Sequence, residues 1–282
     1  MNKRNLEENF FKILMLASVI IVAGSLVFVV VTIVFNGVSS LSVEMFTQTS
    51  AGEFYLGKGG GFLNAIIGSI ILAIPSTIFA FLIGIGIALY LQRDFTSTRM
   101  SNFIRLSLDI LWGVPSVVYG VFCLFIMIAV GLSYSVLFGI VALTLLEIPI
   151  ITRSIDESIK VVPQSLKESA YSLGSTKFET AVKVVRKQAM PGIITGVLLG
   201  LGRGIGDAAS ILLTVGDSNY IPNSIFSQTA ALPTMILNLI GMPNDIVKRK
   251  AYAVAFVLLI IVLLISIITR YLTKKSSRYI IK

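Results

Sequence analysis

The 282-residue sequence contains no histidine, one cysteine and few charged residues. The absence of histidine excludes imidazole-based acid–base chemistry and histidine metal sites, and a lone cysteine excludes an intrachain disulfide and a multi-cysteine metal site. Charged residues make up 13% of the chain, whereas a soluble domain carries about 25%. Hydrophobic residues make up 55%, more than one soluble core can bury, so the composition predicts a membrane protein.

Four runs of the sequence carry no charged residue at all, and each reaches the roughly 18 residues of a spanning helix. They cover 13–43, 59–92, 110–146 and 251–269, and the third divides at Gly131-Leu132-Ser133. The first run is too long for a signal-peptide core, so we expect a retained helix. We predict an all-α polytopic membrane protein with six transmembrane helices near Phe11–Phe35, Phe62–Leu91, Ile110–Val130, Ser133–Thr152, Ile193–Val215 and Ala251–Tyr271.

The net charge of +9 comes from basic clusters between the predicted spans and at the chain ends. Lys and Arg gather in the N-terminal tail, in 93–105, in 153–187 and in the C-terminal tail. By the positive-inside rule this pattern predicts a multi-pass protein of the cell membrane, surrounded by lipid, with both termini in the cytoplasm. It also argues against nucleic acid as a partner. Lys248-Arg249-Lys250 would fall outside and leaves the topology of residues 217–250 open.

The segment Arg153–Gln188 is more organised than a simple connection between spans. Its apolar residues recur at helical spacing, as in Ile155, Ile159 and Leu166, and Gly174 stands where a left-handed helix cap is favoured. The spacing predicts two or three short amphipathic helices with a sharp turn at Gly174. The alternative to a partner-binding segment is an amphipathic loop lying on the membrane surface.

The fifth predicted span contains two charged residues, Arg203 and Asp207, which a continuous helix would place on one face. An ionised residue at a helix centre costs roughly 2.5–3.5 kcal/mol on insertion scales, so such residues normally face a partner or a cavity. Two interpretations stay open and are compatible: a structural ion pair, or an anion pathway in which Asp207 holds Arg203 in place. The surrounding glycines permit close helix contact and leave room for a solute.

Glu147 lies in the fourth predicted span, two residues before Pro149. We expect it near the cytoplasmic end of that span, where a carboxylate snorkels to the interface or pairs with a neighbouring arginine. No function is assigned to it from the sequence.

Two sequence patterns argue against nucleotide binding by this chain. The glycines around Arg203 do not have the spacing of the dinucleotide fingerprint, since Ile205 occupies the position of its last glycine. The sequence has no Gly-Lys-Ser/Thr phosphate loop either. Any ATP must therefore be hydrolysed by another subunit.

The cytoplasmic segment also resembles a known family. Glu168-Ser169-Ala170, followed after three residues by Gly174, is similar to the Glu-Ala-Ala loop of permease subunits in ATP-binding-cassette (ABC) importers. Ser169 replaces the first alanine of that motif, and Arg186-Lys187 stands where the family usually has Leu-Pro. The resemblance implies a coupling helix that inserts into a cleft of a cytoplasmic ATPase.

The segment from Pro191 to Ala209 resembles the Arg-x-x-Gly-Glu-Thr region of phosphate permeases, with Asp207 for the usual Glu and Ala208 for the usual Thr. Gly113–Gly120 and the group Asn64, Gly68 and Ser69 also match phosphate-permease segments. Over about residues 62–215 the pattern is similar to PstA-type subunits more than to PstC-type subunits.

The resemblance implies a type I ABC-importer permease fold, with residues 1–61 as an N-terminal helix and outer loop and residues 62–282 as a permease core containing the coupling loop 153–188. It implies half of a translocation pathway for inorganic phosphate, with Arg203 and Asp207 in that pathway, and no enzymatic activity or cofactor of its own. The implied partners are a cytoplasmic ATPase dimer, a PstC-type permease and an extracytoplasmic phosphate-binding protein.

Three other functions remain open: a permease for another oxyanion such as phosphonate, molybdate or sulfate, an ATP-independent anion transporter or channel, and a membrane-embedded enzyme. Inverted repeats typical of secondary transporters are not apparent. The lack of histidine and of clustered carboxylates in the spans argues against the enzyme.

Overall fold

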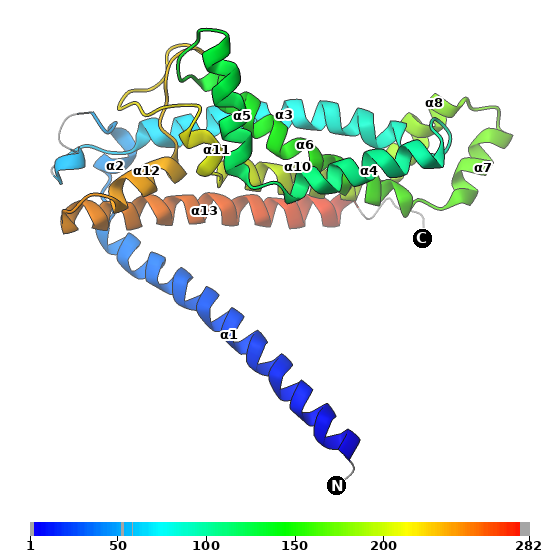
Figure 1. The fold of residues 1–282 in the computed structure, drawn as a ribbon, viewed down its shortest axis with the longest axis horizontal. Helices are drawn as coiled ribbons and strands as arrows, with labels where there is room; N and C mark the ends of the chain where they lie inside the picture. The colour runs from blue at the N-terminus through cyan, green and yellow to red at the C-terminus, as the bar shows by residue number, and fades with distance from the viewer. Residues whose placement is uncertain (1–2, 52–53, 58, 277–282) are drawn as a thin grey trace.

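The computed structural model describes residues 3–51, 54–57 and 59–276, and within these ranges every regular element is helical (Figure 1). The elements are α1 (Lys3–Ser40), α2 (Glu44–Thr47), η1 (Phe54–Leu56), α3 (Leu63–Tyr90), α4 (Thr98–Gly113), α5 (Ser116–Ala129), α6 (Val136–Lys160), α7 (Gln164–Ser172), α8 (Lys177–Glu179), η2 (Thr180–Val185), α9 (Arg186–Gln188), α10 (Met190–Ile205), α11 (Ala209–Leu212), α12 (Leu232–Ile240) and α13 (Asp245–Ser276). The prediction of an all-α fold is confirmed. Parts of the predicted domains 1–61 and 62–282 lie outside the described residues.

Four helices are long and apolar enough to cross a membrane: the portion Glu7–Ser40 of α1, and α3, α6 and α13. They coincide with the first, second, fourth and sixth predicted spans. Lipid offers the backbone N–H and C=O groups of these apolar runs no hydrogen-bond partner. A helix pairs these groups within the segment itself.

The third predicted span, Ile110–Val130, is not one continuous helix. Helices α4 and α5 meet there at an angle of 95°, with Val114 and Pro115 between them. Pro115 has no backbone N–H and disfavours helical geometry at the preceding residue, and Val114 is extended (φ −69°, ψ 130°). The predicted span is therefore broken at Pro115, and α4 and α5 qualify as a membrane span only when the bent pair is taken together.

The fifth predicted span, Ile193–Val215, is also interrupted. Helix α10 ends at Ile205, and the short helix α11 begins only at Ala209. The 16 residues of α10 extend about 24 Å, which is less than the roughly 30 Å of a bilayer core. Arg203 and Asp207 thus flank a helix end and not the middle of a continuous span.

The bundle is built around α3, α6, α10 and α13, which pack along one another (Figure 1). Helices α2 and α12 lie at one end of this bundle, and α7 and α8 lie at the opposite end, near the C-terminus. Helix α1 contacts α13 near Gly37, where the helices approach closely at Tyr252 and Phe256, and its N-terminal part projects away from the bundle. The apolar window of α1 buries none of its residues.

A network of ion pairs joins α4 to α6 near the α7 end of the bundle. The buried carboxylate of Asp156 accepts hydrogen bonds from Arg105 Nε at 2.8 Å and Nη2 at 3.0 Å, which is a bidentate contact. Arg153 Nη1 at 3.0 Å and Lys160 Nζ at 3.2 Å contact the same carboxylate. A buried charge is tolerated when it is paired and hydrogen-bonded in this way, so the network fixes α4 against α6.

Two glycines of α3 allow a direct test of how closely α3 packs against its neighbours. A Cβ atom on Gly68 would overlap the backbone carbonyl oxygen of Ala230, whereas a Cβ atom on Gly86 would have no neighbour within 4 Å. We expect Gly68→Ala to lower the free energy of unfolding by about 2–3 kcal/mol through overpacking. Gly86→Ala should leave it unchanged or raise it by up to about 1 kcal/mol. Thermal or denaturant unfolding of the purified protein in detergent measures both, and equal effects would contradict the packing described here.

Candidate functional site

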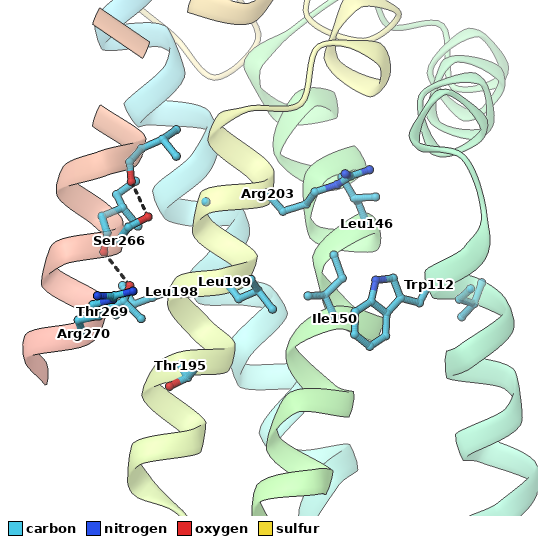
Figure 2. A pocket seen from close by; sticks show the side chains of 14 residues that line it. Trp112, Leu146, Ile150, Thr195, Leu198, Leu199, Arg203, Ser266, Thr269 and Arg270 are labelled. Atoms are coloured by element: carbon cyan, nitrogen blue, oxygen red, sulfur yellow. Dashed lines mark hydrogen bonds between the residues drawn. The ribbon is translucent and has the colours of Figure 1, made fainter. Parts of the chain in front are cut away.

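A concave face of the bundle encloses a cavity of about 650 Å³ (Figure 2). Helix α10 contributes to its floor, α13 lies on one side, and α4 and α6 lie on the other. The lining residues are Leu111, Trp112, Leu146, Ile150, Thr195, Leu198, Leu199, Gly202, Arg203, Val262, Ile265, Ser266, Thr269 and Arg270. This volume lies within the range of small-molecule sites.

Arg203 is one of two charged residues among those that line the cavity. It lies in the last turn of α10, its side chain is exposed, and in Figure 2 it extends toward Leu146 of α6. Among the described residues, no carboxylate lies within 4.0 Å of its guanidinium nitrogens. The ion pair with Asp207, one of the two interpretations of the sequence, is not formed, so the positive charge of Arg203 is presented to the cavity.

Asp207 turns away from Arg203 because the helix ends between them. Its side chain is buried and accepts hydrogen bonds from the backbone N–H of Ser210 at 2.9 Å and from the Ser210 hydroxyl. An aspartate that bonds the backbone three residues ahead competes with a continuous helix and favours the start of a new one. The prediction that Asp207 shares a helix face with Arg203 was therefore wrong, and Asp207 does not line the cavity.

The glycines of α10 divide between two roles. Gly196, Gly200 and Gly204 form a stripe that faces α6, where a Cβ atom would meet Ser154, Ile151 and Glu147 in turn. Small residues at this spacing let two helix backbones approach closely, as predicted for this stripe. Gly202 has no neighbour within 4 Å of an added Cβ atom and opens onto the cavity.

The second charged lining residue, Arg270, stands on α13 beside Ser266 and Thr269 (Figure 2). These two hydroxyls donate to carbonyl groups of their own helix, at 2.9 Å to Val262 and 2.7 Å to Ile265, so their oxygen lone pairs remain able to accept but their protons are engaged. No acidic residue lines the cavity within the described chain. The resulting field is positive and suits an oxyanion.

Sequence reasoning missed the residues that complete this face. Trp112 and Arg270 lie outside the motif around Arg203, and they reach the cavity only because α4 and α13 flank α10. The sequence offered one signal for Arg270: it is the first charged residue after the charge-free run 251–269. Within the described ranges, no three His, Cys, Asp or Glu side chains come together as metal ligands would.

Glu147 does not snorkel to an interface, contrary to the expectation from sequence. It is fully buried where α3, α6 and α10 meet, and its Oε1 accepts a hydrogen bond from Ser76 Oγ at 3.1 Å. The helix extends 13 residues beyond it to Lys160, so Glu147 lies far from that helix end.

The predicted coupling segment forms a second candidate site at the α7 end. Helix α7 ends at Ser172, and Gly174 adopts φ +84°, as predicted for its cap. Two hydrogen bonds complete the cap: Ser175 N donates to Ala170 O at 3.1 Å, and Gly174 N donates to Tyr171 O at 2.9 Å. These are the two bonds of a Schellman motif.

The residues of this segment present different faces. Glu168, Ser169 and Gly174 are exposed, whereas Ala170 is buried against the following π-helical turn η2. Leu173 and Phe178 are apolar but 86% and 68% exposed. Exposed apolar side chains gathered at a turn form a surface that a protein partner can cover.

Comparison with known proteins identifies the family. The family described as "Binding-protein-dependent transport system inner membrane component" matches residues 80–278. The phosphate transport system permease protein PstA of Yersinia pestis is 30% identical over 252 residues, covering 89% of this chain and 85% of that protein. PstA 1 of Mycobacterium tuberculosis is 33% identical over 210 residues, covering 74% of this chain and 69% of that protein.

Solved structures match the fold at lower identity. A bacterial alginate ABC transporter, in complex with its pentasaccharide-bound periplasmic protein, aligns with a TM-score of 0.67 at 14% identity over 96% of each chain. The MetNI methionine ABC transporter in an inward-facing conformation aligns with a TM-score of 0.61 at 21% identity, covering 76% of this chain and 95% of that one. The predicted type I ABC-importer permease fold is confirmed. The chain therefore belongs to the inner membrane components of binding-protein-dependent transport systems, within the PstA group of phosphate transport system permeases.

Proposed function

We propose that the cavity on the concave face is this chain's half of a translocation pathway for inorganic phosphate, with Arg203 as the residue that attracts the anion. The observation that carries the proposal is an arginine that faces a cavity without an acidic partner. The substrate follows from the PstA relatives, whose printed name is phosphate transport system permease protein.

The chemistry of Arg203 fits this role. A guanidinium presents a planar fork of N–H donors that matches the oxygen spacing of phosphate, and it stays charged at every physiological pH. Gly202, one residue away, leaves the backbone beside it uncovered. In this proposal Asp207 acts indirectly, because it fixes the turn at Ser210 that ends α10 just after Arg203.

Coupling to ATP is the second part of the proposal. The chain carries no phosphate loop, so a cytoplasmic ATPase dimer would hydrolyse ATP and the permease itself would have no enzymatic activity. Helix α7 with Glu168, Ser169 and the Gly174 turn would enter the ATPase cleft, and Ala170 would let α7 pack closely on η2. The coupling loop is then 153–188, within a permease core of residues 62–282.

Three contacts support the passage of motion from this loop to the cavity. Asp94, in the turn between α3 and α4, accepts a hydrogen bond at its backbone carbonyl from Lys177 Nζ at 3.1 Å, and Lys167 Nζ lies 3.7 Å from its carboxylate. The bidentate contact between Arg105 and Asp156 ties α4 to α6. Because α4 and α6 also line the cavity, a displacement of α7 would reach the side of the cavity that these two helices form.

The α7 end would face the cytoplasm, with both termini on that side, and the α12 end would face a phosphate-binding protein. Lys250, one of the three basic residues that conflicted with this orientation, is buried at the α12 end and donates to the carbonyl of Phe54 at 3.0 Å. A basic residue engaged in this way weighs less in the positive-inside rule than a solvated one. A PstC-type permease would supply the other half of the pathway.

The role of Arg203 predicts the effect of its substitution. Arg203→Gln should reduce ATP-driven uptake of radiolabelled phosphate by at least about tenfold, because a charged hydrogen bond contributes roughly 1.5–3 kcal/mol. Arg203→Lys should be intermediate, since it keeps the charge but loses the fork. The assay uses proteoliposomes that contain the permease pair, the ATPase and the binding protein.

The control is Arg99→Gln on the exposed face of α4, which should transport like the unmodified protein. Uptake by Arg203→Gln at the control rate would remove Arg203 from the pathway. If an assembled complex hydrolyses ATP but takes up sulfate or another oxyanion in place of phosphate, the pathway stands and the substrate is wrong. Uptake that is independent of ATP would contradict the coupling argument.

The coupling surface predicts a separate effect. Leu173→Glu should weaken co-purification of the ATPase with the permease about tenfold or more, because an exposed apolar anchor would be replaced by a charge in a desolvated contact. Val43→Glu is the matched control: Val43 is 81% exposed, close to the 86% of Leu173, but lies at the α12 end. Equal retention of the ATPase by both variants would show that α7 and its turn are not the contact.

A further inference from the structure

The most isolated ionisable side chain of the bundle is Glu147. It has no solvent exposure, and its Oε1 accepts a hydrogen bond from the hydroxyl of Ser76 at 3.1 Å, while its Oε2 has no hydrogen-bond partner of good geometry. The buried hydroxyl of Thr77 is the other polar group beside this carboxyl. Among the described residues no cationic nitrogen lies within 4.0 Å of either oxygen. This differs from Asp156 on the same helix, whose carboxylate contacts three basic side chains.

The elements around Glu147 offer little to balance a negative charge. Helix α3 carries no charged residue between Leu63 and Tyr90 and faces Glu147 with the hydroxyls of Ser76 and Thr77. Helix α10 faces it with Gly200 and Gly204, and its charged residue, Arg203, lines the cavity instead. Asp207, beyond the end of α10, is itself acidic and bonds Ser210.

An ionised carboxylate in such surroundings is costly, because two neutral hydroxyl groups do not replace the water that solvated it and no cation balances its charge. A neutral carboxylic acid has a far smaller desolvation cost and can still accept the Ser76 hydrogen bond. We propose that Glu147 binds a proton in this state of the permease, and that it positions the end of α10 only while that proton is bound. The effect on transport rests on the proposed role of Arg203, whereas the proton on Glu147 does not.

The positioning follows from contact. A Cβ atom on Gly204 would overlap Glu147 Oε1, so the carboxyl group rests directly on the α10 backbone one residue after Arg203. When the O–H bond of the acid breaks and its proton passes to water, the carboxylate requires water or a cation beside it. Helix α10 must then separate from α6 at this level, and Arg203 leaves its place on the cavity wall. Glu147 is thus a positioning residue and does not itself touch phosphate.

An infrared measurement tests the proton directly and does not depend on transport. The assembled permease–ATPase complex should show, at neutral pH, the carbonyl stretch of a protonated carboxylic acid that disappears in Glu147→Gln. The band should persist in Glu44→Gln, the control at an exposed carboxylate of α2. If the difference between the unmodified protein and Glu147→Gln contains only carboxylate bands, the proposal is overturned, whatever the substrate.

The pH profile tests the positioning role. Phosphate itself titrates, so the quantity compared is the ratio of uptake by the unmodified complex to uptake by Glu147→Gln at each pH. This ratio should be constant at acidic pH and should fall, by up to about tenfold per pH unit, once the pH is high enough to ionise Glu147. A ratio that is flat across the range in which the infrared band disappears would overturn the positioning role.

A variant that does not assemble still leaves a test. If the Glu147→Gln complex does not assemble, Glu147→Met, of similar volume, takes its place in the uptake ratio. The infrared band is then assigned in the unmodified complex with isotope-labelled glutamate and titrated with pH. A complex that fails to transport phosphate at all would contradict the proposed function but would leave the infrared result to decide on Glu147.

Discussion

The close contact between the glycine stripe of α10 and α6 determines where the charged groups of the membrane bundle lie. Because Gly196, Gly200 and Gly204 bring the two backbones together, Glu147 is sealed from solvent between the helices, and Arg203 is left to face the cavity. One helix interface therefore separates an unpartnered acid from an unpartnered arginine. A larger residue in this stripe would displace α10 and alter both environments together.

The α7 end of the bundle treats charge in the opposite way. There Asp156 is surrounded by Arg105, Arg153 and Lys160, and these contacts hold α4 and α6 as a unit. The bundle is closed by small residues around Glu147, and its α7 end is closed by ion pairs. In the proposed coupling, the paired charges would keep α4 and α6 together when α7 moves.

Much of the fold follows from the sequence because lipid constrains the chain strongly. The charge-free runs predicted α1, α3, α6 and α13. Gly174 predicted a turn, because glycine adopts the left-handed conformation without steric cost. Two predicted spans are interrupted, and each interruption has a local cause. Pro115 ends α4 although the sequence around it is apolar throughout. Asp207 accepts a hydrogen bond from Ser210 just after α10 ends, and hydropathy does not predict such a local contact.

The candidate site was only partly predictable for a related reason. Arg203 was found because a charge in an apolar segment is conspicuous, but the assumption of a continuous helix gave it the wrong partner. Arg270 and Trp112 join it through tertiary packing between segments far apart in the chain. Glu147 was predicted to lie near a helix end because the predicted span stopped at Thr152. Helix α6 continues to Lys160, so Glu147 lies in its interior.

The most direct test of the pathway is an electron cryo-microscopy structure of the assembled complex with ATPase, second permease, binding protein and phosphate. The account predicts an oxyanion in the cavity between the two permeases, with oxygen atoms about 2.7–2.9 Å from the guanidinium of Arg203. A complex in which Arg203 faces lipid, or is enclosed in a subunit contact while phosphate passes elsewhere, would contradict it.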